Sequence, residues 1–112
     1  NRFEAAGDVA RQYGPVLLKG YRSLVAGPEQ TPWIVSRGDR TLSVPGSGDV
    51  LAGACAALLA AGVPAEKALA LGAWCHGAAG EALGRMKGQD GVLAHEVSDH
   101  LPAILKELNG AC

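Results

Sequence analysis

A glycine-rich loop that runs directly into an apolar helix constrains this chain more than any other stretch. The loop covers residues 44–49 and reads Val-Pro-Gly-Ser-Gly-Asp, and small, apolar residues follow it as far as Gly62. Gly46 and Gly48 lack a Cβ, so the backbone can take a positive φ there and approach a ligand closely. The first amides of a helix have no intrahelical partner and lie at the positive end of its dipole. Loop and helix together therefore predict an anion site suited to phosphate.

Asp49 stands out because it places a carboxylate inside a site built for anions. Aspartate favours helix starts, so one interpretation is that Asp49 is simply a helix cap. The other is that Asp49 is a general base, which would take the proton of a hydroxyl that attacks a bound phosphate. The glycines that precede it, Gly46 and Gly48, favour the base.

The composition indicates one globular unit without a nucleic-acid or membrane partner. The chain has 112 residues, of which 48% are hydrophobic and 19% charged, with a formal net charge of -1. There is no basic excess for nucleic acid, no signal peptide, and no uncharged apolar stretch of about 18 residues. Cys55, Cys75 and Cys112 are odd in number and form no Cys-x-x-Cys pair, which favours a cytoplasmic location.

Hydrophobic spacing predicts a helix, then three short strands, then three helices. The predicted helices cover residues 2–13, 50–61, 64–86 and 94–108, the strands cover residues 16–18, 23–26 and 33–35, and a polar turn covers residues 37–40. We expect the strand at 16–18 to be buried on both faces, and Pro102 to kink or split the last helix. Glycines 72, 77 and 80 make the long helix thin, so a neighbour can pack close. Three short strands cannot cover so many apolar helices, so we expect further elements before Asn1 in an α/β fold.

Several common motifs are absent. The dinucleotide-binding fingerprint fails because Leu51 stands where its third glycine belongs, and there is no Walker A sequence. No two histidines have metal-ligand spacing, so the sequence predicts no protein metal site. Ser47 lacks the nucleophile elbow of the hydrolases. We expect His76 and Trp74 to be packed within the long helix, with His76 hydrogen-bonded.

Four stretches resemble the C-terminal part of the ribokinase-like NAD(P)H-hydrate dehydratases. The family loop usually reads Leu-Ala-Thr-x-Gly-Ser/Thr-Gly-Asp-Val-Leu-Ala/Thr-Gly, and residues 46–53 match its second part fully. Before them, Val44 stands where the family has Thr and Pro45 where it often has Gly. Residues 18–28, 72–80 and 90–94 are similar to other parts of the same family. The resemblance implies a three-layer α/β/α sandwich, of which residues 1–112 form the C-terminal portion of one nucleotide-binding domain. We expect the N-terminal half of the domain to be missing and this chain to be inactive alone.

The resemblance also implies a reaction and its site. The family repairs hydrated NAD(P)H, called NADHX and NADPHX, by phosphorylating the C6 hydroxyl and then eliminating phosphate, with Mg²⁺ and either ADP or ATP. Asp49 matches the residue at the hydrated nicotinamide and would be the catalytic base. The positions expected to bind nucleotide are Lys19, Gly20, Tyr21, Arg22, Ser23, Gly46, Ser47 and Gly48.

Two other functions stay open at this point. The chain could belong to another ribokinase-like kinase, of the hydroxyethylthiazole or phosphomethylpyrimidine type, in which case the phosphate stays on the product. It could also be a non-catalytic nucleotide-binding fragment. The sequence leaves open the choice between ADP and ATP, the choice between NADHX and NADPHX, and whether the protein is a homo-oligomer.

Overall fold

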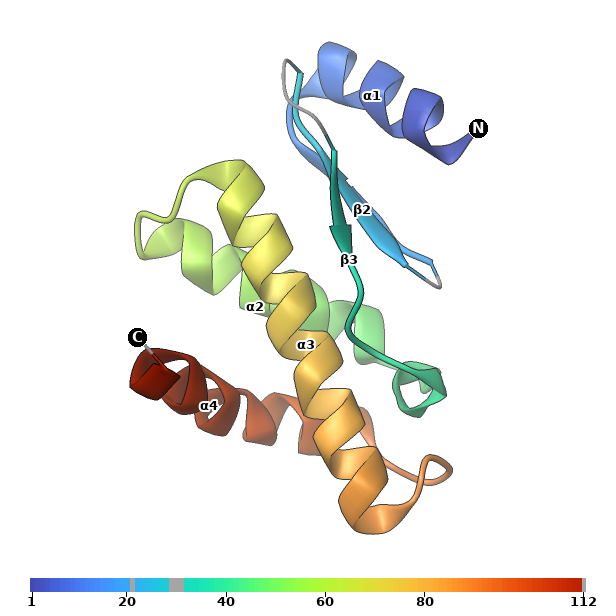
Figure 1. Ribbon diagram of the computed structural model, residues 1–112, viewed down its shortest axis with the longest axis vertical. Helices are drawn as coiled ribbons and strands as arrows, with labels where there is room; N and C mark the ends of the chain where they lie inside the picture. Colours follow the sequence, from blue (N-terminus) through green and yellow to red (C-terminus); the bar gives the residue numbers. More distant parts are fainter. Residues whose placement is uncertain (21, 29–31, 112) are drawn as a thin grey trace.

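The computed structural model describes residues 1–20, 22–28 and 32–111 and contains four α-helices, three strands and one 3₁₀ turn. In chain order these are α1 (Arg2–Tyr13), β1 (Val16–Leu18), β2 (Ser23–Ala26), β3 (Trp33–Val35), η1 (Arg40–Leu42), α2 (Ser47–Ala60), α3 (Ala65–Lys87) and α4 (Ala94–Ala111). The predicted order and the three strand ranges are confirmed. Figure 1 shows α1 at the top of the molecule, beside the sheet, and α4 in its lower half, where it crosses α3.

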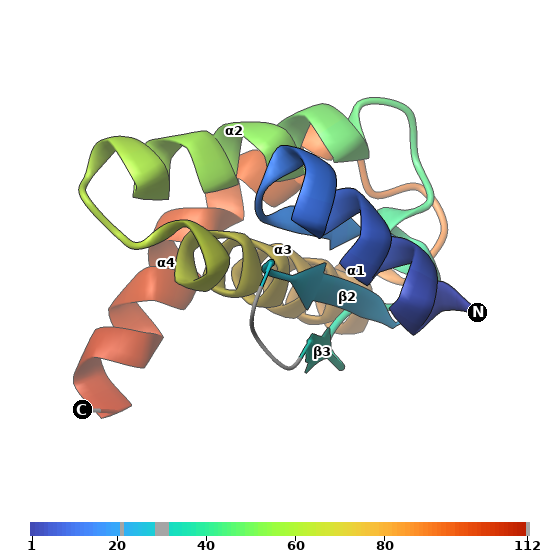
Figure 2. The same ribbon diagram turned by 90° about the horizontal axis from the view of Figure 1, so that it is seen from above.

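The three strands form an antiparallel sheet in the order β1-β2-β3. Alternate residues point to opposite faces of a strand. On one face Val16, Leu18 and Ala26 pack against α1, and on the other face side chains that include Leu17 and Val25 pack against α2 and α3. The sheet therefore lies between two helical layers, seen from a second side in Figure 2. The prediction that the first strand is buried on both faces holds only in part: helices cover both faces of β1, but its three residues are only partly buried.

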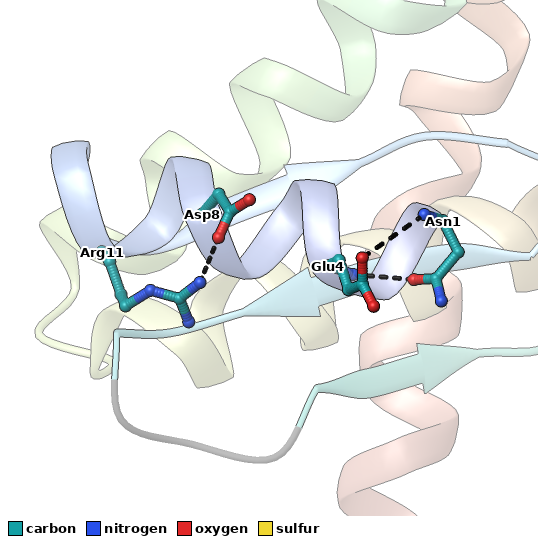
Figure 3. A network of polar contacts seen from close by, with 4 residues as sticks. All are labelled: Asn1, Glu4, Asp8 and Arg11. Carbon is teal, nitrogen blue, oxygen red and sulfur yellow. Dashed lines mark hydrogen bonds and ion pairs between the residues drawn. The ribbon is translucent and has the colours of Figure 1, made fainter.

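Local polar contacts stabilise α1 from its exposed side. The Asn1 side chain caps the helix by accepting a hydrogen bond from the backbone amide of Glu4 at 2.9 Å. Asp8 and Arg11 form an ion pair on exposed side chains, one turn apart (Figure 3). Because neither contact reaches another element, they support the helix itself and not its packing.

The second core lies between α3 and α4, where Cys75, Leu83, Val97 and Ile104 are buried together. Of the two outcomes expected at Pro102, a kink or a split, the split does not occur, because α4 continues through that residue as one helix. A proline in a helix interior costs about 3 kcal/mol, so the apolar packing on both sides of it outweighs that cost. In the part of the chain that the structure describes, no helix is long and apolar enough to cross a membrane.

Glycines give α3 a smooth face that its neighbours approach closely, as predicted. A Cβ added at Gly72 would lie 2.6 Å from Cys55 Sγ of α2, and one at Gly80 would lie 2.6 Å from Leu42 Cδ2. A Cβ added at Gly77 would lie 2.4 Å from the carbonyl oxygen of Arg37. The segment 37–42, which connects β3 to the glycine-rich loop, therefore packs directly against α3.

Candidate functional site

The glycine-rich loop ends in a helix start with open amides. Gly46 is the N-cap of α2, with a φ of 88°, and no side chain caps the helix. The amide of Ser47 donates to the carbonyl of Val44 at 3.2 Å, and the amide of Val50 donates to Gly46 at 3.1 Å. Within the described residues, no hydrogen bond engages the two amides between them, those of Gly48 and Asp49. These two donors are available to an anion.

The structure corrects the conformation expected in this loop. The positive φ belongs to Gly46 alone, because α2 already begins at Ser47 and Gly48 is helical. Gly48 instead allows a close approach: a Cβ there would lie 2.9 Å from Lys19 Nζ. The Lys19 ammonium thus lies beside the helix start, where it adds positive charge to the two open amides.

An open cavity of about 770 Å³ adjoins this helix start. Its cationic side chains are Lys19, Arg37 and Arg40, and Asp39 is the one carboxylate in its lining, so the lining favours an anionic ligand. The lining residues are Lys19, Gly20, Ser23, Arg37, Gly38, Asp39, Arg40, Leu42, Ser43, Ser47, Leu51, Ala73, His76, Gly77 and Gln89.

A buried polar pair lies in this lining, close to the start of α2. His76 Nε2 is 3.2 Å from Ser47 Oγ, and the two residues are only 5% and 6% exposed. Burial lowers the pKa of His76, the hydrogen bond with Ser47 opposes this shift, and the charge of Lys19 adds to it. A neutral imidazole can either donate to or accept from the serine hydroxyl. The prediction that His76 is packed and hydrogen-bonded is confirmed.

A second wall of the cavity is formed by residues 37–40, and two carboxylates and a glutamine hold it in place. Glu81 of α3 accepts hydrogen bonds from Arg37 Nε at 2.9 Å and from the Gly38 amide at 2.6 Å. Burial raises the pKa of the Glu81 carboxyl, but these hydrogen bonds outweigh it and bring the pKa below its ordinary value. Asp39 accepts from the Thr41 amide at 2.9 Å and from Gln89 Nε2 at 3.0 Å. This wall is therefore held by charge-assisted hydrogen bonds at both of its ends.

The structure brings together four of the eight predicted site residues that it describes. Lys19, Gly20, Ser23 and Ser47 line the cavity. Tyr21 lies outside the described residues. The other predicted positions, Arg22, Gly46, Gly48 and Asp49, are described but are not part of the lining.

Asp49 is exposed and is the third residue of α2. Because Gly46 is the N-cap and no side chain caps the helix, the interpretation of Asp49 as a helix cap is wrong. Among the described residues, no group of three or more His, Cys, Asp or Glu side chains could hold a metal ion.

Sequence reasoning missed the second wall of the cavity. Residues 37–40 were expected to be only a polar turn, yet all four line the cavity, and so does Gln89. Their partners are far away in the sequence: Arg37 and Glu81 are 44 residues apart, and Asp39 and Gln89 are 50 apart. The one usable signal was the glycine spacing in α3, which predicted a close neighbour without identifying it.

The geometry defines a class of protein: an α/β domain in which a glycine-rich helix start with open amides meets a cavity lined by cationic side chains. The sequence model described as NAD(P)H-hydrate dehydratase, of the carbohydrate-kinase type, matches residues 1–103. The chain belongs to the NAD(P)H-hydrate dehydratase family.

Curated relatives and solved structures carry the same description. The chain is 40% identical over 109 residues to the bifunctional NAD(P)H-hydrate repair enzyme Nnr of Moorella thermoacetica, covering 96% of this chain and 21% of that enzyme. It is 43% identical over 84 residues to the ADP-dependent (S)-NAD(P)H-hydrate dehydratase of Neisseria meningitidis, covering 74% of this chain and 28% of that one. The Bacillus subtilis ADP/ATP-dependent dehydratase, co-crystallised with ATP/Mg²⁺, superposes with a TM-score of 0.88 at 30% identity, covering 96% of this chain and 39% of that one. The chain thus spans only a fifth to two fifths of these relatives.

Proposed function

We propose that this chain contributes the nucleotide-binding side of an enzyme that dehydrates NADHX and NADPHX to NADH and NADPH. The observation that carries the proposal is the start of α2, where two open amides and the Lys19 ammonium adjoin a cationic cavity. Membership of the dehydratase family supports the same conclusion. The free, buried thiols of Cys55 and Cys75 favour a cytoplasmic location for this enzyme.

The cavity is the proposed site of the nucleotide, which is ADP or ATP. Lys19, Gly20 and Ser23 line it, which supports the proposed contact of residues 19–23 with the AMP part. Gly46, Ser47 and Gly48 form the adjoining helix start, where the open amides of Gly48 and Asp49 would bind phosphate oxygens.

The lining suits the phosphates of the nucleotide better than a bare cation. It holds three cationic side chains and one carboxylate, and Asp39 already accepts two hydrogen bonds. Mg²⁺ usually keeps several waters and is bound in part through substrate phosphates. We therefore propose that Mg²⁺ is held by the nucleotide and water, while Lys19 and the open amides hold the nucleotide itself.

Asp49 is the proposed general base. The nucleotide supplies a phosphoryl group to the C6 hydroxyl of the hydrate, and the Asp49 carboxylate takes the proton of that hydroxyl. Phosphorylation makes a poor leaving group into a good one, and elimination of phosphate then restores the nicotinamide ring. The exposure of Asp49 supports this role because its carboxylate is free to meet an acceptor.

The test is recovery of the near-ultraviolet absorbance of reduced nicotinamide from NADPHX, using the complete protein with Mg²⁺ and either ADP or ATP. We expect wild type to be active and Asp49→Asn to lose about 10²–10⁴-fold in kcat, the usual contribution of a general base. Nucleotide binding should stay equal or become tighter, because a negative charge leaves a phosphate site. A variant that keeps kcat within about threefold would raise the activation barrier by less than about 1 kcal/mol, and the base role would then be wrong.

The two alternatives give different results in the same assay. A kinase of the thiazole or pyrimidine type would leave phosphate on its product, which mass spectrometry would detect. A non-catalytic module would bind nucleotide and show no turnover with either donor.

A further inference from the structure

The guanidinium of Arg37 is held from two directions by α3. Its Nε donates to Glu81 Oε2 at 2.9 Å, and its Cζ lies 4.7 Å from the centroid of the Trp74 ring. An arginine carries five N–H donors, of which this arrangement uses one. In the described part of the chain, no hydrogen bond is formed by the four donors on the two Nη atoms. Arg37 lines the cavity and Glu81 does not, so the four donors on the Nη atoms of Arg37 are the ones that a ligand in the cavity would meet.

The backbone beneath Arg37 is fixed by the same face of α3. Trp74, Gly77 and Glu81 are spaced by three and four residues, so they share one side of the helix. Gly77 leaves room for the Arg37 carbonyl, which would lie 2.4 Å from a Cβ at that position. Glu81 also accepts from the Gly38 amide at 2.6 Å. On one side of α3, the Trp74 ring, the space at Gly77 and the Glu81 carboxylate thus hold both the main chain and the side chain of Arg37.

This degree of ordering is more than an ion pair needs. Arg37 and Glu81 have side-chain exposures of 30% and 25%, and partly exposed ion pairs add little to stability. A planar guanidinium held at its Nε and stacked on an aromatic ring is, however, well prepared to bind the oxygens of a phosphate in a fork-like way. Since Arg37 is one of three cations in a lining with one carboxylate, the ligand that fits is a polyanion.

We propose that Arg37 binds the phosphate groups of the nucleotide in this cavity and that Glu81 is the positioning residue that orients it. The inference rests on the proposed function, because it takes the occupant of the cavity to be ADP or ATP. It adds a basis for specificity: the affinity of the site should depend strongly on the phosphate charge of the ligand and much less on its nucleoside.

The experiment compares Arg37→Ala with a matched control in the complete protein. The control is Arg11→Ala, which removes an arginine that is ion-paired on the exposed side of α1, outside the cavity lining (Figure 3). Calorimetric titrations with ADP, ATP, adenosine and pyrophosphate measure binding. We expect Arg37→Ala to raise the Kd for ADP, ATP and pyrophosphate about tenfold, the equivalent of about 1.4 kcal/mol, and the Kd for adenosine less than about twofold. Arg11→Ala should change none of them, and Arg37→Lys should recover part of the loss because it keeps the charge without the fork.

Glu81→Gln tests the positioning role through kinetics. It keeps the size of the side chain but removes the charge that both donors share, so KM for the nucleotide should rise about threefold or more while kcat stays within about twofold. A merely structural role would lower the yield or the unfolding midpoint and leave KM unchanged.

The outcomes separate the two proposals. If wild type binds neither ADP, ATP nor pyrophosphate, the proposed function fails and this inference falls with it. If wild type binds them and Arg37→Ala binds them equally well, only the role of Arg37 is wrong. If Arg37→Ala loses adenosine as strongly as ADP, Arg37 supports the cavity wall and does not recognise phosphate.

Discussion

Replacing Gly77 by alanine tests whether the segment 37–42 is seated on α3. The added Cβ would lie 2.4 Å from the carbonyl oxygen and 2.5 Å from the carbonyl carbon of Arg37. These are backbone atoms, which cannot rotate away as a flexible side chain could. Ordinary contact begins at 3.4 Å, so the segment or the helix must move by about 1 Å to accept the methyl group.

The expected cost follows from three effects. Overpacking a tight contact costs about 1–3 kcal/mol. The shift also weakens the hydrogen bond from the Gly38 amide to the Glu81 carboxylate, a type of bond that contributes about 1.5–3 kcal/mol. Alanine gains up to about 1 kcal/mol over glycine in a helix interior. The net expectation is that Gly77→Ala lowers the free energy of unfolding by about 1–3 kcal/mol, because the two losses exceed the gain.

Gly53→Ala is the matched control for this experiment. Gly53 is also inside a helix, but it is exposed and a Cβ there would meet nothing within 4 Å. The same substitution should therefore raise the free energy of unfolding by about 0.5–1 kcal/mol. Urea unfolding of the complete protein measures both, and nucleotide affinity should fall only for Gly77→Ala because Gly77 lines the cavity. The reasoning is refuted if Gly77→Ala stabilises the protein as Gly53→Ala does.

Two further predictions concern the floor and the phosphate side of the cavity. Gly48→Ala would place a Cβ 2.9 Å from Lys19 Nζ. Because that ammonium is flexible, we expect the fold to stay intact and the Kd for nucleotide, measured by calorimetry, to rise about tenfold. An unchanged Kd would exclude Lys19 from the phosphate site. The pKa of His76 is lowered in the fold, so the unfolded chain binds the proton first as the pH falls. The contribution of His76 to the free energy of unfolding is therefore complete above about pH 6.5 and is lost as the pH drops below it. Urea unfolding between about pH 7.5 and 5.5 should therefore show a smaller pH dependence for His76→Gln than for wild type, and equal slopes would contradict the assignment.

The sequence predicted the elements well because their signals are local. The spacing of apolar residues predicted the helices α1, α3 and α4, and short apolar runs located all three strands. The absence of a split at Pro102 has a related origin. A propensity rule sees only the missing amide, whereas the helix is kept by burial of Val97 before it and Ile104 after it.

The candidate site was predicted on one side only. The Gly-Ser-Gly-Asp loop and the Lys-Gly pair carry motifs of their own, so Lys19, Gly20 and Ser47 could be assigned from the sequence. The wall formed by residues 37–40 has no such motif, because its conformation is set by Glu81 and Gln89, which come from distant parts of the chain. Its role becomes visible only when α3 brings those side chains to the cavity.

The position of Asp49 resolves the apparent conflict of a carboxylate within an anion site. In a phosphoryl transfer the attacking and leaving oxygens lie roughly in line on opposite sides of the phosphorus. A carboxylate within the cavity, beside Lys19, would weaken the positive charge that the phosphates need. Asp49 instead lies two residues beyond Ser47, exposed and outside the cavity lining. One turn of α2 can therefore offer its amides to the donor within the cavity and its carboxylate to an acceptor that arrives from outside.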